Sequence, residues 1–159
     1  MGRTRSSRGK REPAISTATA AAAAPADRRS KALLWVFAGV TLVFFVATAR
    51  GYGYFRDELY YLVNGEHLGF GYVEHPPLIG YLAALVRATL GDSLVAIRLL
   101  PALAAAATVW LVGALAGELG GGRFAQALAM AATLLAPEYL SQFSNLSMNP
   151  FDVLLWAVT

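Results

Sequence analysis

The chain has 159 residues, of which 57% are hydrophobic and only 14% are charged, and its mean hydropathy is +0.50. Soluble domains carry about 25% charged residues, so this composition excludes an ordinary soluble domain and indicates a membrane protein. The chain has no cysteine, which excludes a disulfide framework and a thiolate metal site. Its net charge is +3, but eight of its thirteen lysines and arginines lie in the first 31 residues. This distribution is an orientation signal, and we expect no nucleic-acid partner.

Residues 1–31 are basic, rich in alanine, serine and threonine, and free of aromatic residues. Such a segment cannot bury enough apolar surface to offset its ordering entropy, so we expect a disordered cytoplasmic tail. Residues 32–49 carry no charge and would span about 27 Å as a helix, close to the hydrocarbon thickness of a bilayer. The basic residues before this run place the N-terminus in the cytoplasm and the next loop outside.

A cleaved signal peptide is the alternative interpretation of this first apolar run. The A-x-A pattern at residues 47–49 and the arginine pair at residues 28–29 are typical of such a leader. The run is longer than a usual signal core, however, and further membrane segments follow it, so an uncleaved helix is favoured.

The predicted first outer loop covers residues 50–93, and its polar centre runs from Arg56 to Pro77. These 22 residues hold four of the ten carboxylates and both histidines of the chain. Ionisable groups are costly beside a bilayer, so a cluster between apolar segments is a functional candidate. A solvated loop joining two helices is the simpler interpretation of the same composition.

Residues 78–90 form a helix-like apolar run that is only about 20 Å long, too short to span a bilayer. We expect this helix to lie at the outer interface, with Arg87 extending to the headgroups. Gly91, Asp92 and Ser93 then end it and offer caps for the next helix.

Three further spans are predicted at residues 94–117, 124–140 and 150–159. The third stops about halfway through a membrane, so we expect the chain to be the N-terminal part of a longer protein. The predicted fold class is therefore an all-α integral membrane protein, a polytopic bundle with interfacial helices in its first outer loop. Beyond the tail, all carboxylates except Glu118 fall at or near the outer face: Asp57, Glu58, Glu66, Glu74, Asp92, Glu138 and Asp152.

Several short motifs follow the first span in a fixed order. They are Asp57-Glu58, then Glu74-His75-Pro76-Pro77-Leu78, then Gly91-Asp92-Ser93, the run from Arg98 to Leu103, and Asn149-Pro150-Phe151-Asp152. In this order and topology, residues 32–159 resemble the front part of the GT-C glycosyltransferases. More specifically, they resemble the bacterial branch of glycosyltransferase family 39, related to protein O-mannosyltransferases and the aminoarabinose transferase of lipid A.

The resemblance implies a GT-C-type helical bundle in the plasma (inner) membrane, multi-pass, with its active site on the extracytoplasmic side. It implies an enzyme that moves a sugar from a polyprenyl-phosphate donor to an acceptor hydroxyl by inverting direct displacement. The acceptor would be a protein, a lipid or a glycan, and a divalent metal is a further candidate component. Membrane lipids are the remaining expected partner. Because distal parts of such an enzyme are missing, we expect these 159 residues alone to be inactive.

The chemistry of transfer assigns roles to the motif residues. A carboxylate must take the proton of the acceptor hydroxyl, contributing about 10²–10⁴-fold, and cations, a metal or amide donors must hold the departing phosphate. By resemblance, Asp57 is the expected general base, with Glu58 beside it in the catalytic pair. Glu74 is the candidate metal ligand or donor-pocket residue. The candidates for binding the donor and its phosphate are His75, Arg56, Arg98 and Asp152.

His75 departs from the family pattern, since many relatives have lysine at this position. An imidazole is mostly neutral near pH 7, so Arg56 or Arg98 would have to supply the missing charge. The remaining polar and aromatic residues of the loop receive simpler roles. We expect Glu66 and His67 to be solvated, and the aromatic residues to be interfacial anchors: Tyr60, Tyr61, Phe70 and Tyr72.

A transporter or a flippase for the carrier lipid is the alternative function. Such a protein should place acidic residues near the bilayer midplane, often in broken helices. The predicted spans lack acidic residues at their centres, which favours the enzyme.

Overall fold

The computed structural model describes residues 28–159, and this part of the chain contains seven α-helices and no β-strand. The helices are α1 (Arg28–Thr48), α2 (Arg56–Glu66), α3 (Leu78–Leu90), α4 (Leu94–Glu118), α5 (Arg123–Leu135), α6 (Pro137–Gln142) and α7 (Asn149–Val158). Of these, α1 and α4 are long and apolar enough to cross a membrane, with windows of mean hydropathy 2.0 in each. The expected all-helical architecture is confirmed for the described residues.

Helix α1 begins earlier than the sequence predicts. Residues 28–31, assigned to the disordered tail, form its first turn, while the rest of the predicted tail lies outside the described residues. Arginine and lysine are good helix formers, so the backbone continues as a helix beyond the apolar run that defines the predicted span.

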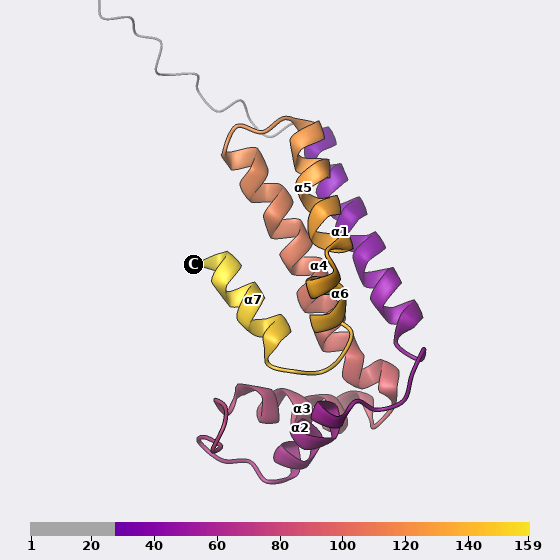
Figure 1. The fold of residues 1–159 in the computed structure, drawn as a ribbon, viewed down its shortest axis with the longest axis vertical. Coiled ribbons are helices and arrows are strands. Elements are labelled where there is room, and N and C mark those ends of the chain that lie inside the picture. Colours follow the sequence, from indigo (N-terminus) through magenta and orange to yellow (C-terminus); the bar gives the residue numbers. More distant parts are fainter. Residues whose placement is uncertain (1–27) are drawn as a thin grey trace, which may run out of the picture.

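Helices α1, α4 and α5 lie side by side as a bundle (Figure 1). At Gly113 of α4, a β-carbon would lie within 2.5 Å of both the Leu34 side chain of α1 and the Met130 sulfur of α5. Leu34 and Met130 are buried there with Val109. The absence of a side chain at Gly113 is therefore what lets the three helices approach one another, as small residues do in membrane helix packing.

The predicted span at residues 124–140 is divided in the structure. Helix α5 ends at Leu135, and Ala136 is extended with φ −64° and ψ 124° before α6 begins at Pro137. Proline disfavours the helical conformation of the residue before it, so the helix does not continue unbroken past Pro137. At 13 residues, α5 is too short to span a bilayer as a straight helix.

Helices α2 and α3 lie across the end of the bundle where α1 ends and α4 begins (Figure 1). We call α2, α3 and the residues between them, 56–90, the crosswise layer. Its core consists of apolar side chains from α2, α3 and α4 together with Leu146: Tyr61, Ile79, Ala83, Val86, Ala96, Ile97 and Leu146.

The turn between α3 and α4 has the capping chemistry that the sequence predicts. Gly91 ends α3 with a φ of 81°, a conformation that favours glycine. The Ser93 hydroxyl accepts a hydrogen bond from the Ala96 N–H at 3.2 Å and so caps α4.

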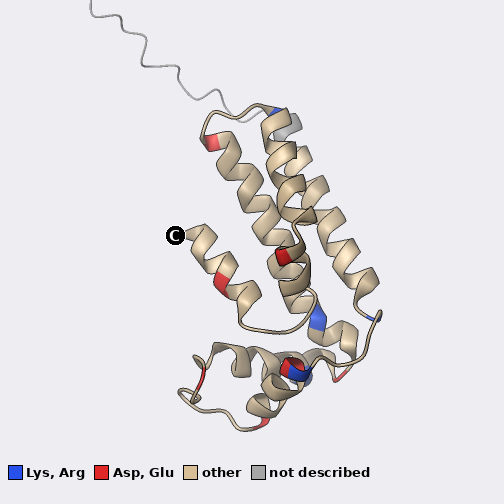
Figure 2. Ribbon diagram, viewed as in Figure 1, with Lys and Arg blue, Asp and Glu red and all other residues tan. Residues whose placement is uncertain are grey.

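Figure 2 shows the long uncharged stretches of α1, α4 and α5 and the charges of the crosswise layer.

Candidate functional site

The Glu58 carboxylate is fully buried and is paired with Arg98 of α4. Its Oε1 accepts from Arg98 Nε at 2.8 Å and from the Leu146 backbone N–H at 3.1 Å. Its Oε2 accepts from Arg98 Nη2 and from the Phe55 backbone N–H, both at 2.8 Å. We call the Glu58–Arg98 pair the clasp.

The Arg98 guanidinium is also enclosed, with 3% of the residue exposed. Beyond the clasp it donates from Nη1 to the carbonyl oxygens of Ala49 at 2.6 Å and Tyr52 at 3.2 Å, and from Nη2 to that of Gly53 at 2.8 Å. The Tyr52 ring lies 4.2 Å from the guanidinium carbon. All five N–H donors of the arginine thus have partners inside the protein, and none faces a ligand.

Asp57, the predicted base, lies in the first turn of α2 next to the clasp. Its side chain is 42% exposed, and its Oδ1 accepts from Arg56 Nε at 3.1 Å. Arg56 is itself 89% exposed. The first turn of a helix favours a negative charge because its N–H groups point toward it. Asp57 is thus an accessible carboxylate with a solvent-exposed cation beside it.

His75 is buried, and protein atoms contact both of its ring nitrogens. Nε2 lies 3.0 Å from the Asn64 amide nitrogen, and Nδ1 lies 2.9 Å from the carbonyl oxygen of Pro76. A neutral ring that donates from Nδ1 to Pro76 and accepts from Asn64 at Nε2 satisfies both contacts. The rings of Tyr60, Tyr61 and Tyr72 surround the imidazole at centroid distances of 4.9–5.6 Å. His75, which we expected to bind the donor phosphate, is therefore held by protein contacts inside the crosswise layer.

Tyr61 is a buried residue of α2 that packs against His75. It follows Asp57 by one helical turn on α2, and its ring packs 5.1 Å from that of His75, the residue after Glu74. Burial raises the pKa of the Tyr61 hydroxyl above its usual value, and the charges of Asp57, Tyr60 and Glu74 raise it further. Tyr61 is only 7% exposed, so it is a core residue and not the interfacial anchor that we expected.

A second arginine cluster lies at the surface of the crosswise layer. Arg87 of α3 donates to Glu66 from Nη1 and to Asp92 from Nε, each at 2.5 Å. These hydrogen bonds raise the pKa of the Arg87 guanidinium above its usual value, with Glu66 contributing most. The expected extension of Arg87 toward headgroups is thus replaced by an ion-pair network, although its side chain remains 31% exposed.

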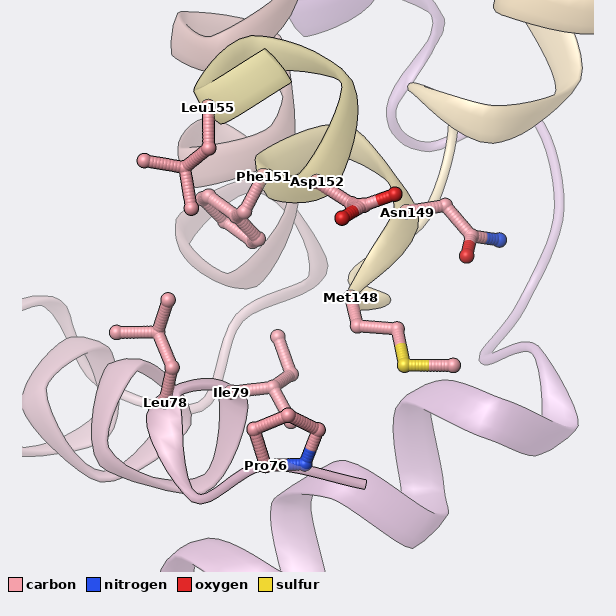
Figure 3. Close-up of a pocket in the computed structure, with 8 residues that line it drawn as sticks. All are labelled: Pro76, Leu78, Ile79, Met148, Asn149, Phe151, Asp152 and Leu155. Carbon is pink, nitrogen blue, oxygen red and sulfur yellow. The ribbon is translucent and has the colours of Figure 1, made fainter. Parts of the chain in front are cut away.

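Asp152 lies at a pocket of about 370 Å³ between the first turns of α3 and α7. The pocket is lined by Pro76, Leu78, Ile79, Met148, Asn149, Phe151, Asp152 and Leu155. Figure 3 shows apolar side chains of both helices on its walls, with the carboxylate of Asp152 and the amide of Asn149 on one side. Asp57 and Glu74 are not among its lining residues. The structure therefore places the predicted site residues in two locations.

No group of three His, Asp or Glu side chains within residues 28–159 is arranged to hold a metal ion. Glu74 is exposed in the segment before α3. The role of Glu74 as a metal ligand stays a prediction.

The sequence interpretation missed Asn64 and Leu146 as parts of this region. The Asn64 amide contacts the ring of His75, eleven residues later. The Leu146 backbone N–H donates to the carboxylate of Glu58, 88 residues earlier. Neither contact has a signature in a local pattern, because both depend on how distant segments are brought together.

Comparison with known proteins adds the family. The model of the dolichyl-phosphate-mannose-protein mannosyltransferase family matches residues 74–159, more than half of the chain. The match includes Glu74, His75, Arg98 and Asp152, whereas Asp57 and Glu58 precede it. No curated protein and no solved structure matches the chain. From the family match, the chain belongs to the dolichyl-phosphate-mannose-protein mannosyltransferase family and is a membrane glycosyltransferase of the mannosyltransferase kind.

Proposed function

We propose that the protein transfers a sugar from a polyprenyl-phosphate donor to an acceptor hydroxyl at the extracytoplasmic face of the plasma membrane. The family match supports sugar transfer. The placement of the crosswise layer at one end of two membrane-length helices supports a site at the membrane surface. At that position the lipid part of a donor stays in the bilayer while its sugar meets polar residues.

Asp57 is the proposed general base, and its accessibility is the observation that carries this role. The carboxylate of Glu58 is closed off by four donors and by complete burial, whereas the neighbouring Asp57 side chain is 42% exposed. A base must come within hydrogen-bond reach of the hydroxyl that it deprotonates. Of the two adjacent carboxylates, only Asp57 meets this requirement.

The proposed reaction is a single displacement. The acceptor oxygen attacks the anomeric carbon of the sugar while Asp57 takes the hydroxyl proton. The bond between that carbon and the phosphate oxygen breaks, and polyprenyl phosphate leaves with the electron pair. Every donor of Arg98 is already occupied. We therefore propose that the exposed Arg56 beside Asp57 stabilises the negative charge of the departing phosphate, as cations do.

Asp152 takes a different role in this proposal. A carboxylate without a metal repels a phosphate, but it accepts hydrogen bonds from hydroxyl groups. We therefore propose that Asp152 and Asn149 bind hydroxyl groups of the sugar or the acceptor. The apolar walls of the pocket would contact the apolar part of the bound molecule.

The test compares Asp57→Asn with Glu66→Gln in the complete protein, in membranes supplied with labelled polyprenyl-phosphate sugars. Both residues lie on α2, are partly or fully exposed, and pair with an arginine, so Glu66→Gln is the matched control. We expect Asp57→Asn to lower the transfer rate about 10²–10⁴-fold at unchanged expression, and Glu66→Gln to leave it near wild type. Equal rates in both variants would remove Asp57 from the mechanism. Wild-type movement of carrier lipid without sugar transfer would support the flippase alternative.

A further inference from the structure

We propose that the clasp is a positioning device that fixes the first turn of α2, with Asp57, relative to the pocket at α7. Its catalytic consequence rests on the function proposed above, whereas its effect on geometry does not. Glu58 and Arg98, expected from the sequence to act in catalysis and phosphate binding, become positioning residues.

The hydrogen bonds of the clasp leave no capacity for substrate. Each carboxylate oxygen of Glu58 accepts two donors, and each of the five N–H groups of Arg98 has an acceptor. Binding a phosphate or taking a proton would require breaking these contacts in a buried site. An unpaired buried charge is strongly unfavourable, so the clasp stays closed while substrates bind elsewhere.

The clasp joins segments that are distant in the sequence. Arg98 belongs to α4 and contacts the residue after α1, Ala49, whereas Glu58 contacts Phe55, the residue before α2. The remaining partner is Leu146, in the connection between α6 and α7. One buried group therefore ties the ends of the bundle helices, the crosswise layer and the approach to α7 together.

These ties end next to the two candidate site locations. Asp57 lies between Arg56 and the clasped Glu58 at the start of α2, so its backbone is held while its side chain remains accessible. Leu146 precedes Met148, which lines the pocket, by two residues. The buried pair of the clasp thus links the proposed base to the pocket, beside the apolar core that Tyr61, Ile79 and Leu146 share.

The first experiment measures that geometry without using activity. The 159 residues contain no cysteine, so spin labels can be placed at Leu59→Cys on α2 and Trp156→Cys on α7, where both side chains are exposed. Any cysteine elsewhere in the complete protein is replaced by serine. We expect a narrow distance distribution in the labelled parent, and a broader or shifted one after Glu58→Gln or Arg98→Lys.

Arg87→Lys is the matched control because Arg87 also forms ion pairs, with Glu66 and Asp92, but at the surface. We expect it to leave the distance distribution unchanged. Glu58→Gln keeps the shape of the side chain and carries the test if Arg98→Lys fails to fold. A distribution that stays narrow in the folded Glu58→Gln protein would overturn the proposal.

The second experiment measures catalysis. We expect Glu58→Gln to lower kcat about 10²-fold, as misplacement of a catalytic group does, with little change in KM. The ionisation in the pH profile of kcat/KM that belongs to the base should persist in Glu58→Gln and disappear in Asp57→Asn. In the Asp57→Asn background, Glu58→Gln should have little additional effect on kcat.

Each outcome separates the clasp from the proposed function. Loss of the base ionisation in Glu58→Gln would make Glu58 the base and overturn its positioning role. Additive losses in the double variant would show that Glu58 acts independently of Asp57. An inactive wild type would contradict the proposed function, and the distance measurement would still decide whether the clasp sets the geometry.

Discussion

The two arginine clusters, the clasp and the cluster of Arg87 at the surface of the crosswise layer, have similar chemistry and opposite surroundings. Arg98 binds Glu58 and three backbone carbonyls with 2% of its side chain exposed, whereas Arg87 binds Glu66 and Asp92 with 31% exposed. Water can replace the partners of Arg87 if they are lost, but it cannot replace those of Arg98. The same ion pair is therefore a weak surface interaction in one place and a structural requirement in the other.

The largest effect is expected when one half of the clasp is removed. Arg98→Ala leaves the Glu58 carboxylate buried without its cation and should lower the free energy of unfolding by about 3–5 kcal/mol. Denaturant unfolding in detergent, followed by circular dichroism, measures this loss. A loss no greater than that caused by Arg87→Ala would show that the two clusters are equivalent.

Removing both halves sharpens the comparison. Replacing a buried ion pair by apolar residues often leaves the free energy of unfolding unchanged. The double variant Glu58→Leu with Arg98→Met, however, also removes the hydrogen-bond partners of the Phe55 and Leu146 N–H groups and of three backbone carbonyls. Each unsatisfied buried group costs about 1–3 kcal/mol. The groups at Tyr52, Gly53 and Phe55 are only part-buried and can turn to water, which leaves the Ala49 carbonyl and the Leu146 N–H as the buried groups. We therefore expect the double variant to remain on the order of 2 kcal/mol less stable than wild type. A free energy of unfolding equal to that of wild type would show that these backbone contacts do not contribute to stability.

The surface cluster should respond weakly. Arg87→Met removes both ion pairs of Arg87 while keeping an apolar stem on α3. We expect a small decrease in the unfolding midpoint at low salt, and no difference from wild type at 1 M salt, where exposed charges are screened over about 3 Å. A decrease that persists at high salt would show that Arg87 acts through packing.

The smallest effect concerns alkaline pH. The pKa of Tyr61 is raised in the folded protein, so the folded state holds this proton more tightly than the unfolded state does. That stabilisation is complete below the unfolded pKa of about 10 and is lost as the pH rises through the folded value. Above pH 10, wild type should lose stability more steeply than Tyr61→Phe. Parallel pH dependences would contradict the raised pKa of Tyr61.

Local chemistry predicted the parts of the fold that depend on neighbours in sequence. The bounds of α3 and the caps at Gly91 and Ser93 follow from an apolar run, a glycine and a hydroxyl. The break at Ala136 was not predicted, because the predicted span at residues 124–140 runs through Pro137, although its cause is equally local. These features need no knowledge of tertiary contacts.

The partners of the ionisable residues could not be predicted in the same way. Nothing in the Asp57-Glu58 pair distinguishes the accessible carboxylate from the buried one, because the difference depends on Arg98, 40 residues away. His75 likewise looks like a ligand until Asn64 and three tyrosine rings enclose it. The sequence thus indicated where polar chemistry gathers, and the tertiary contacts divided it into accessible and buried groups.

The separation of the clasp residues along the chain also sets an order of events during synthesis. Ribosomes add about 5–20 residues per second, so Glu58 emerges roughly 2–8 s before Arg98, which lies 40 residues later. Leu146 follows Glu58 by 88 residues, or roughly 4–18 s. Until Arg98 emerges, the Glu58 carboxylate lacks every partner except Phe55, and until Leu146 follows, its Oε1 still lacks one donor. The final arrangement of the site therefore forms late, after α4 has been inserted and the connection to α7 has been made.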